Sequence, residues 1–341
     1  MSASIEQVLQ MAEDAAQTGE LEDTIALCNQ ALELEPKNPD ALEMKALALG
    51  ELGDFEEADA LFERLIGAHP RRVTALIAAA DVKVRLPGDD RERIEEGLEL
   101  LDRAEPIAKH DGDLSNELWL LRGVAFNQLG ENEDALDAFA RVLQLDPDHV
   151  EAQLEQAMAF FELGRFDEAK KAFLKLTREV PEEPWSFHYL GLIAERRGED
   201  ADSWFARARK IDPDEFPPPV KLSVEAFDRA VAEAIDSLPE HSKPHLENTI
   251  ISVQPLPGDA EIREGLSPTI LGVFDGTPID ERLDTEPAHH QTARITLFQK
   301  NLERFAHTRD ELLEEIRITV LHEVGHLLGL DEDELYDRGL D

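Results

Sequence analysis

Small and aromatic side chains recur at helical spacing through the N-terminal part of the chain. In three segments an alanine is followed four positions later by a phenylalanine, at Ala58 and Phe62, Ala135 and Phe139, and Ala169 and Phe173. Residues four apart lie on one face of an α-helix. Alanine lets two helices approach closely, and phenylalanine fills the groove beside it. The pattern therefore predicts closely packed helices.

Glycine and proline punctuate these helices with a period of 34 residues. The glycine suits the left-handed end of a helix, and the proline marks the end of the next one, because it cannot continue a helix. Five units share the pattern, at Gly19 and Pro36, Gly53 and Pro70, Gly130 and Pro147, Gly164 and Pro181, and Gly198 and Pro213. A sixth unit, with Gly88 and Pro106, is irregular and is followed by an insertion at Lys109–Asn116.

The period and the glycine, alanine, phenylalanine and proline positions resemble those of the tetratricopeptide repeat family. The resemblance covers about residues 4–216 and implies an all-α helical-repeat solenoid of about six repeats, placed in a domain at residues 1–216. Solenoids of this kind commonly bind peptides or proteins on their concave face. We therefore expect a protein or peptide partner there. The alternative is an array that only scaffolds or covers the rest of the chain.

Three consecutive prolines, Pro217 to Pro219, end the periodic pattern and favour a stiff, extended linker. We expect this linker at residues 217–221 and a second domain at residues 222–341. Its hydrophobic pattern predicts a helix at Val224–Leu238, short strands at Thr249–Val253 and Ile270–Phe274, a half-exposed strand at Arg294–Phe298, and a helix at Thr308–Leu328. The sequence thus predicts a multidomain protein, with the solenoid followed by a small α+β domain.

The last predicted helix carries the sequence His322-Glu323-Val324-Gly325-His326. Two histidines four apart project from one helix face and can bind one zinc ion. Glu323 follows the first histidine on nearly the same side, where it can act as a general base toward water. The alternatives are two hydrogen-bonded core histidines, or a zinc site without turnover. The predicted cofactor is Zn²⁺, with His322 and His326 as ligands and Glu323 as the catalytic residue.

A catalytic zinc site has three protein ligands and one open position, so a third ligand is expected. Gly329 allows the chain to turn back toward the metal, and Glu332 follows His326 by six residues. Glu332 is therefore the predicted third ligand. The alternatives left open are Asp331, Asp333, His289, His290 and the absence of a third protein ligand.

Three segments resemble the bacterial minimal zincin-like metallopeptidase family. They are Ile270–Pro278, with the sequence ILGVFDGTP, Arg294–Phe298, with RITLF, and Leu321–Leu335, with LHEVGHLLGLDEDEL. The resemblance extends over residues 222–340 and implies a zinc-dependent peptidase in which an acidic residue takes the third ligand place. The segment after the motif departs from the metzincin pattern, because an acid replaces its third histidine.

The net charge and the cysteine content limit which classes of partner and which cellular compartment we expect. The formal net charge of −41 repels nucleic acid and anionic membranes, which bind to clusters of lysine and arginine. The single cysteine, Cys28, allows no intrachain disulfide and lies in a predicted helix, where we expect it in the core. We find no signal peptide and no apolar stretch long enough to cross a membrane. The expected location is the cytoplasm.

Three functions fit these patterns. The first is a zinc metallopeptidase whose repeats recruit the protein to be cut and whose strand Arg294–Phe298 serves as the edge on which an extended substrate pairs. The alternative is a non-catalytic scaffold in which the repeats bind a partner and zinc only stabilises the C-terminal domain. A regulator whose metal-bound C-terminus is moved by the repeats is a third possibility. Turnover of peptides distinguishes the first function from the others.

Overall fold

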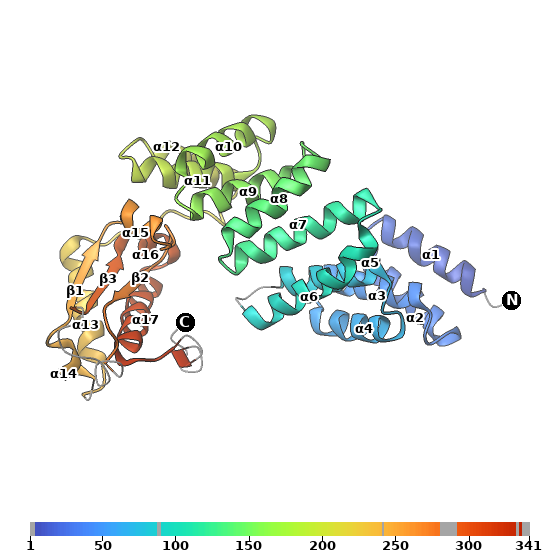
Figure 1. Ribbon diagram of the computed structural model, residues 1–341, viewed down its shortest axis with the longest axis horizontal. Coiled ribbons are helices and arrows are strands. Elements are labelled where there is room, and N and C mark those ends of the chain that lie inside the picture. The colour runs from blue at the N-terminus through green and yellow to red at the C-terminus, as the bar shows by residue number, and fades with distance from the viewer. Residues whose placement is uncertain (1–3, 87–89, 241, 280–291, 332–333, 336–341) are drawn as a thin grey trace. The chain divides into compact units, whose positions relative to one another are not determined.

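The computed structural model describes residues 4–86, 90–240, 242–279, 292–331 and 334–335 (Figure 1). The chain divides into two compact units, Met1–Phe160 and Phe161–Asp341. The boundaries predicted at residues 216 and 222 remain predictions.

The first unit is built from antiparallel helix pairs. Its helices are α1 (Ile5–Gln17), α2 (Leu21–Leu34), α3 (Pro39–Glu51), α4 (Phe55–Ala68), α5 (Val73–Arg85), α6 (Arg91–Ala108), α7 (Gly112–Gln128), α8 (Asn132–Leu145) and α9 (Val150–Glu162), the last of which runs into the second unit. Ala58, Phe62, Ala135 and Phe139 are fully buried. This burial confirms that the alanine and phenylalanine positions form the contact between helices.

The glycines of the five regular units have φ between 67° and 85°, the left-handed conformation expected at the end of each first helix. The irregular sixth unit departs from the expected placing of glycine and proline at helix ends. Pro106 lies inside the last turn of α6 and does not end that helix, while Gly88 lies outside the described residues. Helix α6 has 18 residues and α7 has 17; the insertion supplies the first turn of α7, and the Asp111 side chain caps its start.

The second unit begins with three further helices, α10 (Phe166–Glu179), α11 (Pro184–Arg196) and α12 (Asp202–Ile211). It continues through α13 (Val224–Ser237), α14 (Lys243–Leu246), β1 (Ile250–Gln254), α15 (Asp259–Arg263), β2 (Gly272–Asp275), β3 (Arg294–Phe298), α16 (Gln299–Phe305) and α17 (Arg309–Leu328). The predicted helices at both ends and all three predicted strands are therefore confirmed, with small shifts of their bounds.

The three strands form one sheet in the order β1-β3-β2, with β1 parallel and β2 antiparallel to β3. Helices α13 and α17 contact one another, and α17 also contacts β2 and β3. Their apolar side chains share one core, in which Phe227 of α13, Ile295 and Leu297 of β3 and Val320 of α17 are buried. This core fixes the position of α17 against the sheet.

The position of β3 overturns two expectations. The strand is central, so it is not a free edge for a substrate, and residues Ile295 to Phe298 are all buried where a half-exposed strand was predicted. Thr296 looked like a solvent-facing position because it is polar. Its hydroxyl instead hydrogen-bonds that of Ser252 in β1 at 3.2 Å, which permits burial of both groups between neighbouring strands. None of the helices in the described ranges is long and apolar enough to cross a membrane.

Candidate metal centre

Helix α17 is held firmly at both ends. Thr308 accepts a hydrogen bond from the Glu311 N–H at 3.2 Å, and the Glu311 carboxylate accepts one from the Thr308 N–H at 3.3 Å, so the two residues form a capping box. Gly329 ends the helix with φ of 92°, and the Leu330 N–H then donates to the Gly325 carbonyl at 3.0 Å. The helix thus presents its last turns in a fixed orientation.

The two histidines of the motif converge. The Nε2 atoms of His322 and His326 lie 3.0 Å apart, and both side chains are half-buried. The Nδ1 atom of His326 lies 3.1 Å from the Leu330 carbonyl oxygen, to which it can only donate. That contact places the proton of a neutral His326 on Nδ1, so its Nε2 atom, which faces His322 Nε2, carries the lone pair, as in metal-binding histidines.

Glu323 lies on the sheet side of the same helix, with 5% of its surface exposed. It faces Gly272 of β2 so closely that a Cβ atom on this glycine would lie 2.9 Å from Glu323 Oε1 and 2.6 Å from Thr319 Cγ2. Gly272 was not among the site residues predicted from the sequence. Its signal was a glycine at the start of a short β-branched strand, which often marks a close approach of another group.

The chain turns back over α17 after Gly329, as predicted. Leu335 is fully buried, and a Cβ atom on Gly325 would lie 2.3 Å from its Cδ2 atom, so this leucine packs directly on the helix between the two histidines. Asp331 caps the short turn that follows, because its Oδ1 accepts from the Glu334 N–H at 2.9 Å while its own N–H donates to Glu334 Oε2 at 3.3 Å. The alternative ligand Asp331 is therefore engaged as a cap.

Glu332, the predicted third ligand, lies outside the described residues, as do the alternatives Asp333, His289 and His290. The described residues contain no group of three or more histidines, cysteines or acids placed to hold one metal ion. The donors that are described nonetheless fit zinc, because two imidazole nitrogens converge on one point and a buried carboxylate stands beside them. His322 and His326 would hold the ion, and Glu332 remains the predicted third ligand.

Comparisons with known protein families agree with both halves of this description. Residues 246–340 match the zincin-like metallopeptidase family. Residues 15–80 and 127–186 match one tetratricopeptide repeat family, and residues 90–150 match a second.

Two curated proteins are similar to part of the chain. Human protein O-mannosyl-transferase TMTC3 is 28% identical over 169 residues, which is 47% of this chain and 17% of that protein. Anaphase-promoting complex subunit 3 of Schizosaccharomyces pombe is 26% identical over 195 residues, 54% of this chain and 27% of that protein. The chain thus spans about a quarter or less of the length of these relatives.

Solved structures show the same fold for the helical region. PilW, described as a widely conserved type IV pilus biogenesis factor, is similar with a TM-score of 0.55 and 18% identity, covering 63% of this chain and 96% of PilW. Pseudomonas aeruginosa pilF is similar with a TM-score of 0.52 and 17% identity, covering 62% of this chain and 92% of pilF. Together these findings identify the chain as one that carries tetratricopeptide repeats in its N-terminal region and a zincin-like metallopeptidase domain at residues 246–340.

Proposed function

We propose that this protein is a zinc-dependent peptidase whose repeats recruit the protein or peptide that it cuts. The observation that carries the proposal is the convergence of His322 and His326, with Nε2 atoms 3.0 Å apart, next to the buried carboxylate of Glu323. A zinc ion held there, with Glu332 as the third ligand, would supply Lewis acidity toward water and toward a peptide carbonyl.

The protein's own groups supply the proton transfers and the orientation. Glu323 takes a proton from the attacking water and passes it to the leaving amine. Its burial against β2 limits its motion, because the backbone at Gly272 leaves no space on that side. The Leu330 carbonyl holds the His326 ring in one orientation and one tautomer.

Strand β2 replaces β3 as the proposed platform for an extended substrate. Among the described strands it pairs only with β3, so its other side is an edge, and its first residue lies against Glu323. An extended peptide that adds to a sheet edge gains main-chain hydrogen bonds regardless of its sequence. Pairing along β2 would therefore bring a peptide bond to the general base.

The repeats are proposed to choose the partner. Helices α1 and α3, with Arg72, line a hollow of about 640 Å³ whose other charged groups are Glu6, Glu13, Asp40 and Glu43. Arg72 pairs with Asp40 at 2.7 Å and with Glu43. It therefore does not neutralise the negative charges of Glu6 and Glu13 on α1. Together with the net charge of −41, this favours a cationic peptide segment as the partner.

The test is hydrolysis of a peptide library by the zinc-loaded full chain, compared with Glu323→Gln. The variant keeps the shape of the side chain and removes the base, so we expect hydrolysis to fall by roughly 10²–10⁴-fold. Zinc content is expected to stay unchanged. Glu314→Gln is the matched control, since Glu314 is an exposed acid on the same helix.

Equal hydrolysis by Glu323→Gln and the parent protein contradicts the assigned base. Absence of hydrolysis from both proteins, with zinc bound and raising the melting temperature, would instead establish the non-catalytic scaffold.

A further inference from the structure

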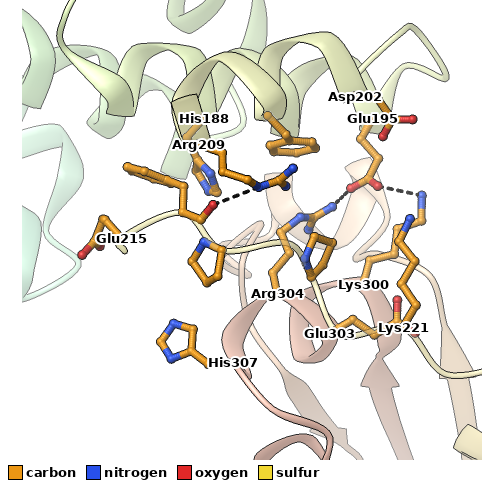
Figure 2. Close-up of a pocket in the computed structure, with 14 residues that line it drawn as sticks. His188, Glu195, Asp202, Arg209, Glu215, Lys221, Lys300, Glu303, Arg304 and His307 are labelled. Carbon is orange, nitrogen blue, oxygen red and sulfur yellow. Dashed lines mark hydrogen bonds and ion pairs between the residues drawn. The ribbon is translucent and has the colours of Figure 1, made fainter. Parts of the chain in front are cut away.

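A second candidate site lies within the second unit, beside the proline segment formed by Pro217 to Pro219. It is a cavity of about 340 Å³ between α11, α12, residues 215–221 and α16 (Figure 2). Neither histidine of the candidate metal centre lines it. Its volume falls in the range typical of sites for small organic ligands.

One wall of the cavity is aromatic. The His188 ring lies 5.5 Å from the Phe205 ring and 5.0 Å from the Phe216 ring, measured between centroids. Burial, with a further effect of Arg304, lowers the pKa of His188 to about 4. His188 is therefore neutral at neutral pH and acts as a third aromatic surface. Pro217 and Pro219 extend this apolar lining.

Two arginines point into the cavity from different helices (Figure 2). Arg304 of α16 is ion-paired with Glu195 and lies 5.3 Å from the Phe205 ring centre. Arg209 of α12 donates through Nε to the Phe216 carbonyl at 3.2 Å. Since that bond uses only Nε, the outer Nη groups of Arg209 remain available in the described part of the chain.

The acids that line the cavity do not neutralise Arg209. Glu195 is engaged by Arg304 and by Lys300, whose Nζ lies 3.2 Å from Glu195 Oε1. Glu303 accepts hydrogen bonds from the Leu222 N–H at 3.0 Å and from the Gln299 amide at 2.8 Å. Asp202 and Glu215 point away from the cavity in Figure 2. The site therefore offers one guanidinium without a carboxylate partner among the described residues, beside an aromatic wall.

We propose that this cavity binds a carboxylate carried on an apolar, preferably aromatic, group. A planar guanidinium matches a carboxylate through two parallel hydrogen bonds, and the aromatic wall covers the apolar part of the ligand. Arg209 and Lys221 are the lining cations that pair with no carboxylate among the described residues, and only Arg209 has the planar fork that matches a carboxylate. The ligand is either a small free acid or the C-terminal residue of a peptide, since both present this chemistry. The proposal is independent of peptidase activity.

Burial lowers the pKa of Arg304 to about 10, and its charge is paired with that of Glu195. A carboxylate bound to Arg209 would lie in the same cavity as this ion pair. Ligand binding would thus connect α12 and α16, which lie on opposite sides of the proline segment.

The experiment uses the full chain and two pairs of probes. The first pair is N-acetyl-phenylalanine and its amide, and the second is a six-residue peptide ending in phenylalanine with a free or an amidated C-terminus. Binding is measured by calorimetry and by tryptophan fluorescence, because the Trp185 ring lies 4.9 Å from the Phe216 ring. We expect each acid to bind at least about tenfold more tightly than its amide, since only the acid forms the charge-assisted pair.

Arg209→Gln is expected to reduce binding of the acid at least about tenfold and to remove its preference over the amide. Arg209→Lys, which keeps the charge but loses the planar fork, is expected to bind with intermediate affinity. Arg207→Gln is the matched control, because Arg207 lies on the same helix and outside the cavity lining. Thermal melting of each variant shows whether it remains folded.

Tighter binding of the small acid identifies a free acid as the ligand, and tighter binding of the peptide identifies a chain terminus. Equal binding of acid and amide, or an acid preference that survives in a folded Arg209→Gln protein, overturns the proposal. So does the absence of binding of all four probes at millimolar concentration.

Discussion

Gly272 in β2 and Glu323 in α17 lie in direct contact, with room between them for a hydrogen but not for a methyl group. The Gly272→Ala variant would place Cβ 2.9 Å from Glu323 Oε1, so the carboxylate must move. We expect peptide hydrolysis to fall by roughly 10–100-fold, because small displacements of a catalytic group are costly.

Zinc content is the second readout for Gly272→Ala, and it should stay at the parental level because Glu323 is not a proposed ligand. Gly67→Ala in α4 is the control, since its Cβ would meet nothing within 4 Å. Parental hydrolysis by Gly272→Ala would show that the position of Glu323 does not matter.

Zinc binding itself is predicted to depend on His326. Elemental analysis of the parent protein should give about one zinc per chain, and His326→Ala should lose it, because two remaining ligands hold zinc poorly. His245→Ala is the control, as His245 is exposed and lies outside α17. An absence of zinc from the parent protein after reloading would remove the metal site altogether.

Gly123 in α7 is predicted to be essential for packing against α8. A Cβ atom there would lie 2.3 Å from the Phe139 ring, which is fully buried. Gly123→Ala should therefore lower the free energy of unfolding by about 1–3 kcal/mol through overpacking. Gly67→Ala should instead be neutral or stabilising by up to about 1 kcal/mol, because alanine favours the helix. Urea titration of both variants shows whether the free energy of unfolding falls or rises.

His188 is predicted to make the protein less stable in acid. Its folded pKa of about 4 lies below the ordinary value of 6.5, so the unfolded chain takes up the proton first as the pH falls. The stability from neutral His188 is present above pH 6.5 and is lost toward pH 4. At pH 5 the loss should be about 2 kcal/mol.

His188→Gln, which cannot titrate, is the comparison for this pH effect, with unfolding followed at pH 7.5 and pH 5. The charged groups around His188 are Glu195 on its own helix, Arg209 on α12 and Arg304 on α16. They are unchanged in the variant. Identical pH dependence of the two proteins would contradict the role of His188.

Cys28 is predicted to resist thiol reagents in the folded protein. It is fully buried, as predicted from its place in a helix, and burial raises its pKa to about 11. Both effects suppress the reactive thiolate. Labelling by a disulfide reagent should be slow in buffer and complete in denaturant. Rapid stoichiometric labelling of the native protein would show that α2 opens readily.

The features predicted from the sequence were those with a local cause. Gly19 and Gly53 end helices because of their own backbone conformation, and Thr308 caps α17 with a partner three residues away. The convergence of His322 and His326 follows from the period of one helix. Each of these patterns is contained in a few consecutive residues.

The features missed depend on contacts between distant segments. The central place of β3 requires β1 and β2 on either side, and nothing in Arg294–Phe298 specifies both neighbours. Gly272 meets Glu323 only through the packing of α17 on the sheet. The cavity between α12 and α16 likewise joins Arg209 to Arg304 across the proline segment.

The proline segment has a mechanical consequence. Phe216 is tied to Arg209 of α12, while the Val220 N–H donates to the Glu303 carbonyl of α16 at 3.0 Å. Hydrogen bonds at both ends make this segment a rigid linker and not a flexible one. A flexible linker raises the effective concentration of a bound partner without fixing its orientation, whereas a rigid linker also fixes the orientation. A partner bound to α11 and α12 would therefore be held in a fixed orientation relative to the sheet and α17.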